Sequence, residues 1–292
     1  MDSSLSPEWY RDQSAESSVQ DTIATIDHIK RIDPNYTIVS PIVTPRFAPS
    51  CTSPLLSSLG TLAKDYGLPI QTHISENRDE IKLVKKLFPE HENYADVYDK
   101  HGLLGPKTVL AHAIHLSDAE RTLISQRRAK VSHCAASNSS LASGTARVRW
   151  LLDGGVDVGL GTDVSGGYSP SILEAVRQSL LVSRLLAVRP EEGEKAKLTV
   201  DEVLYLATRG GAKVLGLEEK VGAFEVGMEW DAQLIGLEEV TADGRLGGAD
   251  GGAVDVFGWE VWEDKLAKWV FNGDDRNTLA VWVKGRLVHE RR

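Results

Sequence analysis

The sequence predicts an α/β fold built on a parallel sheet, followed by a smaller β-rich element. Over about the first 217 residues, short apolar and β-branched runs alternate with stretches of helical periodicity. Each run stays apolar until its C-terminal end, which is typical of parallel strands buried on both faces. After Leu217 the runs shorten and tight glycine turns separate them, as in antiparallel β structure.

Five runs are the predicted strands of the parallel sheet, and helices fill the gaps between them. In chain order the strands are 36–47, 69–77, 107–116, 129–138 and 156–164. Ser117 and Thr199 each precede a glutamate by three residues, which predicts two helices that begin with capping boxes. A third helix is predicted to begin at Ser169-Pro170. Strand–helix units in a row imply right-handed crossovers.

We therefore expect two domains, 1–217 with the parallel sheet and 218–292 with short strands. In the second, residues 241–255 are rich in Gly and Asp and are predicted to form a flexible loop. Isolated strand pairs are marginally stable, so this element needs further packing. Three tryptophans are expected to anchor that packing, namely Trp259, Trp262 and Trp269.

Composition indicates an ordinary globular protein, with 41% hydrophobic and 26% charged residues. The net charge of −9, without a cluster of Lys and Arg, argues against nucleic acid or an anionic membrane as the partner. No apolar run approaches the ~18 residues that a membrane span needs. Two cysteines, Cys51 and Cys134, cannot make a disulfide framework, so we expect a cytoplasmic protein. Cys134 is expected to be a buried structural thiol.

Polar side chains gather at the C-terminal ends of the predicted strands. They are Arg46, His73, Glu76, His112, His133 and Asp163. A single strand-end histidine is more often structural than functional, but the ends of parallel strands share one edge, where active sites form. Imidazole and carboxylate groups are ligands of zinc, which lowers the pKa of a bound water towards ~7. A carboxylate beside the metal can then carry the proton, so the set predicts metal-assisted hydrolysis.

Five motifs together resemble guanine deaminases of the amidohydrolase superfamily, in order and over nearly the whole chain. They are PRF (45–47), THISEN (72–77), LAH (110–112), HCAASNSSL (133–141) and LGTDVSGGYS (160–169). The resemblance implies a TIM-type β/α barrel, of which this chain would hold about the last five strand–helix units. It also implies that guanine is hydrolysed to xanthine and ammonia with one Zn²⁺ ion.

The resemblance also implies roles for individual residues. His73 and Asp163 would bind zinc, and Asp163 would also act as a base. Glu76 would carry the proton to a ring nitrogen of the substrate and help ammonia leave. His112 would orient the water or the tetrahedral intermediate without binding zinc.

The substrate would lie between Arg46, His73 and Glu76, with Phe47 packing nearby. A fixed guanidinium suits the carbonyl or ring-nitrogen acceptors of guanine. Two further residues would shape the pocket, namely Ser137 and Asn138.

Two departures from the family pattern matter. Alanines at 135 and 136 replace a proline and a polar residue, and the H-x-H pair of zinc ligands from the first barrel strand does not occur. The chain resembles the family from just before its fourth barrel strand, so we expect an incomplete copy that is inactive alone. The alternatives are a non-catalytic remnant that binds a purine or a protein, and an amidohydrolase acting on another heterocycle. The family also suggests a homodimer.

Overall fold

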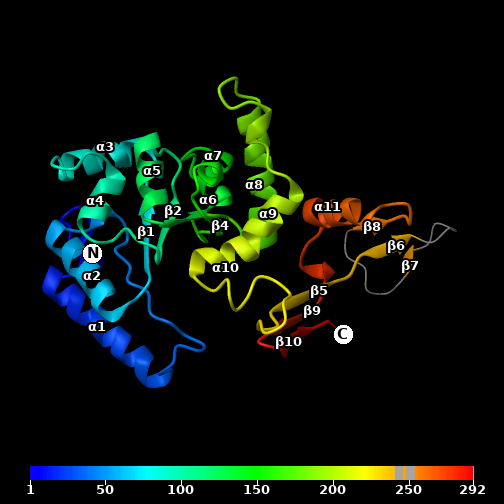
Figure 1. The fold of residues 1–292 in the computed structure, drawn as a ribbon, viewed down its shortest axis with the longest axis horizontal. Helices are drawn as coiled ribbons and strands as arrows, with labels where there is room; N and C mark the ends of the chain where they lie inside the picture. The colour runs from blue at the N-terminus through cyan, green and yellow to red at the C-terminus, as the bar shows by residue number, and fades with distance from the viewer. Residues whose placement is uncertain (241–245, 248–253, 292) are drawn as a thin grey trace.

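The computed structural model describes residues 1–240, 246–247 and 254–291 of the chain. One end of the elongated molecule carries a parallel sheet and most of the helices, and the other carries two small sheets (Figure 1). No helix in these ranges is long and apolar enough to cross a membrane.

Four strands form the parallel sheet, in the spatial order β1-β2-β3-β4. Their bounds are Ile70–Ile74 (β1), Thr108–His112 (β2), Lys130–His133 (β3) and Val158–Leu160 (β4). Neighbours are parallel throughout, and His73 of β1 lies opposite Ala111 of β2. The predicted α/β fold with a parallel sheet is therefore confirmed.

The prediction of a full strand at 36–47 is wrong. In this segment Val43 makes one isolated parallel bridge with Ile70, and the chain beside β1 is otherwise irregular. Pro41 and Pro45 flank the bridge, and a proline cannot donate a hydrogen bond to a ladder. The segment therefore lies along β1 without continuing the sheet as a regular strand.

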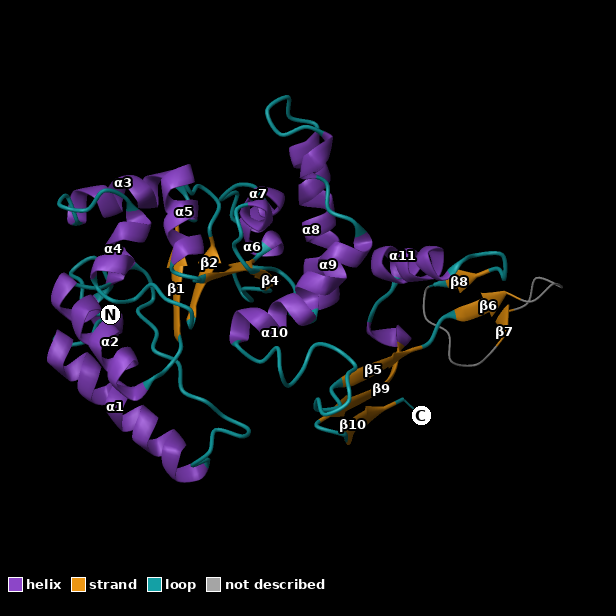
Figure 2. Cartoon of the chain, in the orientation of Figure 1, coloured by secondary structure: helices purple, strands orange, loops and turns teal. Residues whose placement is uncertain are grey.

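Helices pack beside the sheet and continue beyond it towards the C-terminal part (Figure 2). Their bounds are Ala15–Ile32 (α1), Ser53–Tyr66 (α2), Arg78–Leu87 (α3), Tyr94–Lys100 (α4), Asp118–Gln126 (α5), Ala135–Ser140 (α6), Val148–Asp153 (α7), Ile172–Ala187 (α8), Val200–Ala207 (α9), Arg209–Leu215 (α10) and Trp262–Asn272 (α11). The capping boxes at Ser117 and Thr199 are confirmed. The helix predicted from Ser169 begins two residues later, with Ser171 as its cap. The strand predicted at 129–138 ends at His133, where α6 follows.

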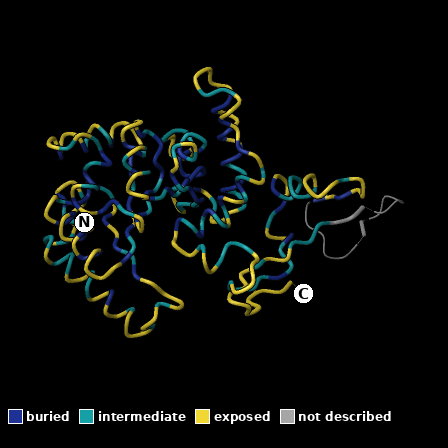
Figure 3. Tube along the Cα trace, in the orientation of Figure 1, coloured by how far each residue is buried: buried dark blue, intermediate teal, exposed yellow. Residues whose placement is uncertain are grey.

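The two faces of the parallel sheet differ, which the prediction of burial on both faces missed. Ile74, Leu110 and Val131 are fully buried and lie on one face of the sheet. Figure 3 shows buried segments, in dark blue, where the helices pack beside the sheet. On the other face Gln71 is exposed and Val109 is half-buried. Strand residues alternate between the two faces, so the difference reflects a sheet with one covered and one open face.

The C-terminal part contains two small sheets. One is antiparallel, in the order β10-β9-β5, with bounds Arg286–Glu290 (β10), Thr278–Val283 (β9) and Ala232–Ile235 (β5). The other has the order β7-β6-β8, with bounds Leu246–Gly247 (β7), Glu238–Val240 (β6) and Asp255–Val256 (β8). The loop predicted at 241–255 lies largely outside the described residues.

Helix α11, which the sequence analysis did not predict, joins this part to α8. Arg177 of α8 donates from Nε to the carbonyl of Val270 at 3.0 Å and from Nη2 to that of Gly273 at 2.8 Å. Trp269 packs against the main core, as expected. Trp259 and Trp262 are 77% and 78% exposed, so the prediction that they anchor packing is wrong.

Candidate metal centre and active site

Three of the predicted strand-end residues come together at one edge of the parallel sheet. His73 comes from β1, His112 ends β2, and Asp163 follows β4. One ligand atom from each lies within 4.8 Å of the other two. Two imidazoles and a carboxylate are a donor set that zinc accepts, so these residues fit the metal that the family resemblance implies.

Main-chain contacts orient His73. Its Nδ1 donates to the carbonyl of Arg46 at 2.6 Å, because a carbonyl oxygen can only accept. The lone pair on Nε2 is then free for a metal, an arrangement common among metal-binding histidines. The ring also stacks on His112, with centroids 5.3 Å apart.

His112 is held in the corresponding way by a side chain. Its Nδ1 lies 2.8 Å from Oδ1 of Asn138. Its Nε2 lies 3.8 Å from Oε2 of Glu76 and 4.0 Å from Oδ2 of Asp163. His112 is 1% exposed, so its orientation is set by the protein rather than by solvent.

The strand ends turn sharply at the site. Ser75, His112 and Asp163 have φ values of 51°, 71° and 46°, in the left-handed region that residues other than glycine rarely adopt. Such conformations persist where surrounding structure enforces them, often at functional sites. A Cβ at Gly166 would lie 2.8 Å from Oδ2 of Asp163 and 2.9 Å from Oγ of Ser137, so the missing side chain lets this turn lie close to the carboxylate.

Glu76 lies between the strand end of β1 and the start of α3. Its Oε1 accepts a hydrogen bond from Oγ of Ser143 at 2.8 Å. Its main-chain N–H donates to Oε2 of Glu80, which also takes part in the capping box of Asn77. Burial raises the pKa of Glu80. The loop after β1 thus presents Glu76 beside His112 with its carboxylate already held.

The structure brings Arg46 to the site through its main chain. Its carbonyl holds His73, while its side chain is exposed and Phe47 is half-buried. The predicted contact of these two side chains with guanine stays a prediction.

His133 is buried at the end of β3 and lies outside the donor cluster. Both of its ring nitrogens lack a hydrogen-bond partner. Burial lowers its pKa to about 4, with a smaller contribution from the charge of His112. The neighbouring Cys134 is buried, as predicted, and burial raises the pKa of its thiol to about 11.

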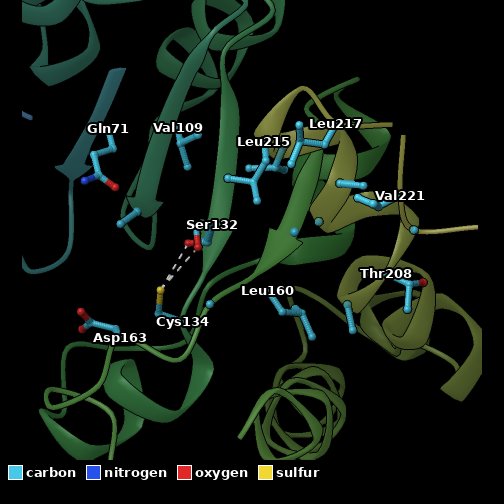
Figure 4. Close-up of a pocket in the computed structure, with 18 of the residues that line it drawn as sticks. Gln71, Val109, Ser132, Cys134, Leu160, Asp163, Thr208, Leu215, Leu217 and Val221 are labelled. Carbon is cyan, nitrogen blue, oxygen red and sulfur yellow. Dashed lines mark hydrogen bonds between the residues drawn. The ribbon is translucent and has the colours of Figure 1, made fainter. Parts of the chain in front are cut away.

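A cavity of about 860 Å³ runs along the open face of the sheet. Asp163 and Cys134 lie towards one end of it, and Leu215 and Leu217 lie towards the other (Figure 4). His73 is also in the wall. The cavity therefore includes the edge with the donor cluster and extends along the strands to residues of α10, which form its other end.

Sequence reasoning missed three contacts that shape the site: the carbonyl of Arg46, the side-chain oxygen of Asn138 and the hydroxyl of Ser143. A carbonyl has no sequence signature. Asn138 was expected to shape the pocket, but its contact with His112 was not predicted. Ser143 follows the strand-end His133 by ten residues, and that proximity is the signal that could have drawn attention to it.

Residues 4–288 match the sequence model of the amidohydrolase family, and the chain belongs to this family. The particular resemblance is to guanine deaminases. The chain is 53% identical over 284 residues to a probable guanine deaminase of Schizosaccharomyces pombe, a match that covers 97% of the chain and 52% of that protein. It is 45% identical over 276 residues to guanine deaminase of Mus musculus, covering 94% of the chain and 59% of the relative.

Among solved structures, a guanine deaminase from C. acetobutylicum with bound guanine matches with a TM-score of 0.85 and 35% identity. This match covers 99% of the chain and 64% of that structure. The resemblance to guanine deaminases is thus confirmed, and the chain spans about half the length of the curated relatives it matches.

Proposed function

We propose that this chain contributes the active site of a zinc-dependent guanine deaminase. The observation that carries the proposal is the cluster of His73, His112 and Asp163 with Glu76 held beside it. The relatives named as guanine deaminases support guanine as the substrate. The site would hold one Zn²⁺ ion, with His73 and Asp163 as ligands.

A zinc ion bound there would make an attacking water acidic enough to react near neutral pH. Glu76 would accept a proton from that water and deliver it to a ring nitrogen of guanine. The bond from carbon to the new oxygen would form in this addition. Glu76 would then take the remaining proton from the new hydroxyl and give it to the exocyclic amino group, so the carbon–nitrogen bond breaks, ammonia leaves and the carbonyl of xanthine forms. His112 would hold the water in place, because its Nε2 faces both Glu76 and Asp163.

We further propose that the four-stranded sheet is part of an eight-stranded barrel. The open face with its cavity supports this, because a closed barrel packs such a face with side chains from all its strands. Additional zinc ligands would then come from the strands that complete the barrel.

The proposal keeps the division into 1–217 and 218–292, supported by the change after α10 from one parallel sheet to two small sheets whose pairs are mostly antiparallel. It also places the protein in the cytoplasm, for which the support is that Cys51 and Cys134 are both free. The homodimer stays a prediction.

The test combines metal analysis with product detection. The chain is prepared alone, and also together with the part of the S. pombe relative that it does not match. Each sample is loaded with Zn²⁺ and given guanine, and xanthine is measured by chromatography. We expect one bound zinc and xanthine formation in the combined sample, with Glu76→Gln abolishing turnover but leaving zinc in place. A folded, zinc-loaded combination that releases no xanthine would refute the proposal.

Replacing Arg46 tests the substrate assignment. If its guanidinium binds the edge of guanine, Arg46→Ala raises KM for guanine by about tenfold or more, the effect of losing a hydrogen bond to a charged group. Arg78→Ala, an exposed arginine on the first turn of α3, serves as the control. Equal KM values in both variants would contradict the assignment.

A further inference from the structure

Three hydrogen bonds hold Ser143 in the loop after α6. Its hydroxyl donates to Oε1 of Glu76 at 2.8 Å. Its main-chain N–H donates to the carbonyl of Asn138 at 2.9 Å, and its own carbonyl accepts from Nε2 of His115 at 2.8 Å. The main chain of Ser143 is therefore fixed on both sides, which leaves its hydroxyl aimed at one carboxylate oxygen.

The same loop is tied to the other half of the site. Asn138, whose carbonyl receives the N–H of Ser143, places its side-chain oxygen 2.8 Å from Nδ1 of His112. One short segment thus contacts both His112 and Glu76. The segment from Asn138 to Ser143 therefore helps to fix the distance of 3.8 Å between Nε2 of His112 and Oε2 of Glu76.

His115 connects this loop to the end of β1. Its Nε2 must carry a hydrogen, because its partner is a carbonyl oxygen. Its main-chain N–H donates to the carbonyl of Ser75, the residue before Glu76. Gly144 has a φ of 138°, and a Cβ there would lie 3.2 Å from the His115 ring, so glycine lets the loop pack closely on the imidazole.

We propose that Ser143 is a positioning residue for Glu76, held in place by His115. Its hydroxyl occupies Oε1 and leaves Oε2 turned towards Nε2 of His112, where the reacting water would lie. The inference rests on the proposed function in one respect, namely that Glu76 carries the proton. A hydrogen bond to a carboxylate is among the stronger ones in proteins, so this contact restricts rotation of the carboxylate effectively.

The contact itself is tested without activity, by urea unfolding of the metal-free chain. Ser143→Ala is compared with the wild type, and again in a Glu76→Ala background. We expect Ser143→Ala to lower the unfolding midpoint in the first comparison and to leave it unchanged in the second. Ser140→Ala, an exposed serine at the end of α6, is the control and shifts neither. Equal losses from Ser143→Ala in both backgrounds would overturn the proposal.

The catalytic consequence is tested in the combined sample that forms xanthine. We expect Ser143→Ala to lower kcat about tenfold, part of the ~10²–10⁴-fold that a positioned acid–base group contributes, with KM for guanine within twofold. Ser143→Thr, which keeps a hydroxyl, restores most of the rate. His115→Phe, which keeps a packed ring but lacks Nε2–H, lowers kcat in the same direction, and its effect does not add to that of Ser143→Ala.

An unchanged kcat in Ser143→Ala, with the wild type active, would overturn the positioning role. If the wild type itself forms no xanthine, the proposed function fails, and the unfolding comparison still decides whether Ser143 holds Glu76.

Discussion

The two faces of the parallel sheet are built from alternate residues of the same strands, but one face packs in the core and the other lines a cavity. On the covered face, Leu110 and Val131 are fully buried within the main core. On the open face, Val109 and Ser132 line a cavity of about 860 Å³. The covered face stabilises the fold through burial of apolar surface, whereas the open face leaves room and carries His73 to the site.

The residues with the proposed chemistry and the residues that stabilise the fold lie on different faces of the sheet. His73 and Asp163 line the open cavity, so the groups proposed to hold a metal lie outside the apolar core on the covered face. A substitution on the covered face should therefore act on stability, and one on the open face should act on ligands. Four measurements can break or sharpen this division.

Adjacent residues on β2 give the largest contrast. Leu110 is 0% exposed, and Leu110→Ala should reduce the free energy of unfolding by about 2–5 kcal/mol, because it removes buried methyl groups and leaves a cavity. Val109→Ala, on the open face, should cost about 1 kcal/mol or less. Urea unfolding of both variants measures the difference. Comparable losses would mean that the open face is packed as tightly as the other.

His133 is a buried titratable side chain on the covered face, and it predicts a pH dependence. Its pKa is about 4 in the fold against 6.5 as the ordinary value, so the unfolded chain takes up a proton first as pH falls. Stability should therefore fall between pH 6.5 and pH 4, with His133 accounting for up to about 3 kcal/mol.

The check is the unfolding free energy of the metal-free chain at pH 7 and pH 4.5. His133→Leu should lose less stability over this interval than the wild type. His289→Asn changes an exposed histidine and should behave as the wild type does. Parallel pH profiles for all three proteins would show that His133 does not stay neutral in the fold.

At the metal-facing edge the effect should appear in affinity rather than stability. Asp163→Asn removes a proposed ligand and should weaken zinc binding by more than the about 10–100-fold that is usual for losing a residue that only orients a ligand. Asn138→Ala removes the partner of His112, which is not a proposed ligand, and should change zinc affinity little. Competition with a chelating dye measures both. Unaltered zinc affinity in Asp163→Asn would show that Asp163 is not a zinc ligand.

The smallest effect is expected at the outer edge of the open face. Gln71 is exposed, and its Nε2 donates to Oγ1 of Thr44 at 3.0 Å. Gln71→Ala should cost about 0.5–1.5 kcal/mol at most, the net value of one hydrogen bond. Thermal unfolding provides the measurement. A loss as large as that of Leu110→Ala would show that the edge segment around Thr44 is essential to the sheet.

Several features of the fold were predictable because their causes are local. The capping boxes at Ser117 and Thr199 depend on residues three positions apart, and both helices form as predicted. The apolar runs that became β1 and β2 were also recognisable, because the residues of their buried face recur at every second position. The prediction of a strand at 36–47 was wrong because it relied on the β-branched residues. The prolines in this segment cannot donate hydrogen bonds to a ladder, so the strand does not continue.

By itself, the sequence determined the α/β fold and the set of strand-end residues, His73, His112 and Asp163 among them, because chain order and periodicity encode both. Only the tertiary structure decided which face of the sheet stays open, since that depends on which elements pack against it. It also decided that Asn138 and Ser143 support His112 and Glu76. The contact of Asn138 with His112 joins residues 26 positions apart, and that of Ser143 with Glu76 joins residues 67 positions apart. Because the partners are so far apart in the sequence, only the folded chain brings donor and acceptor together.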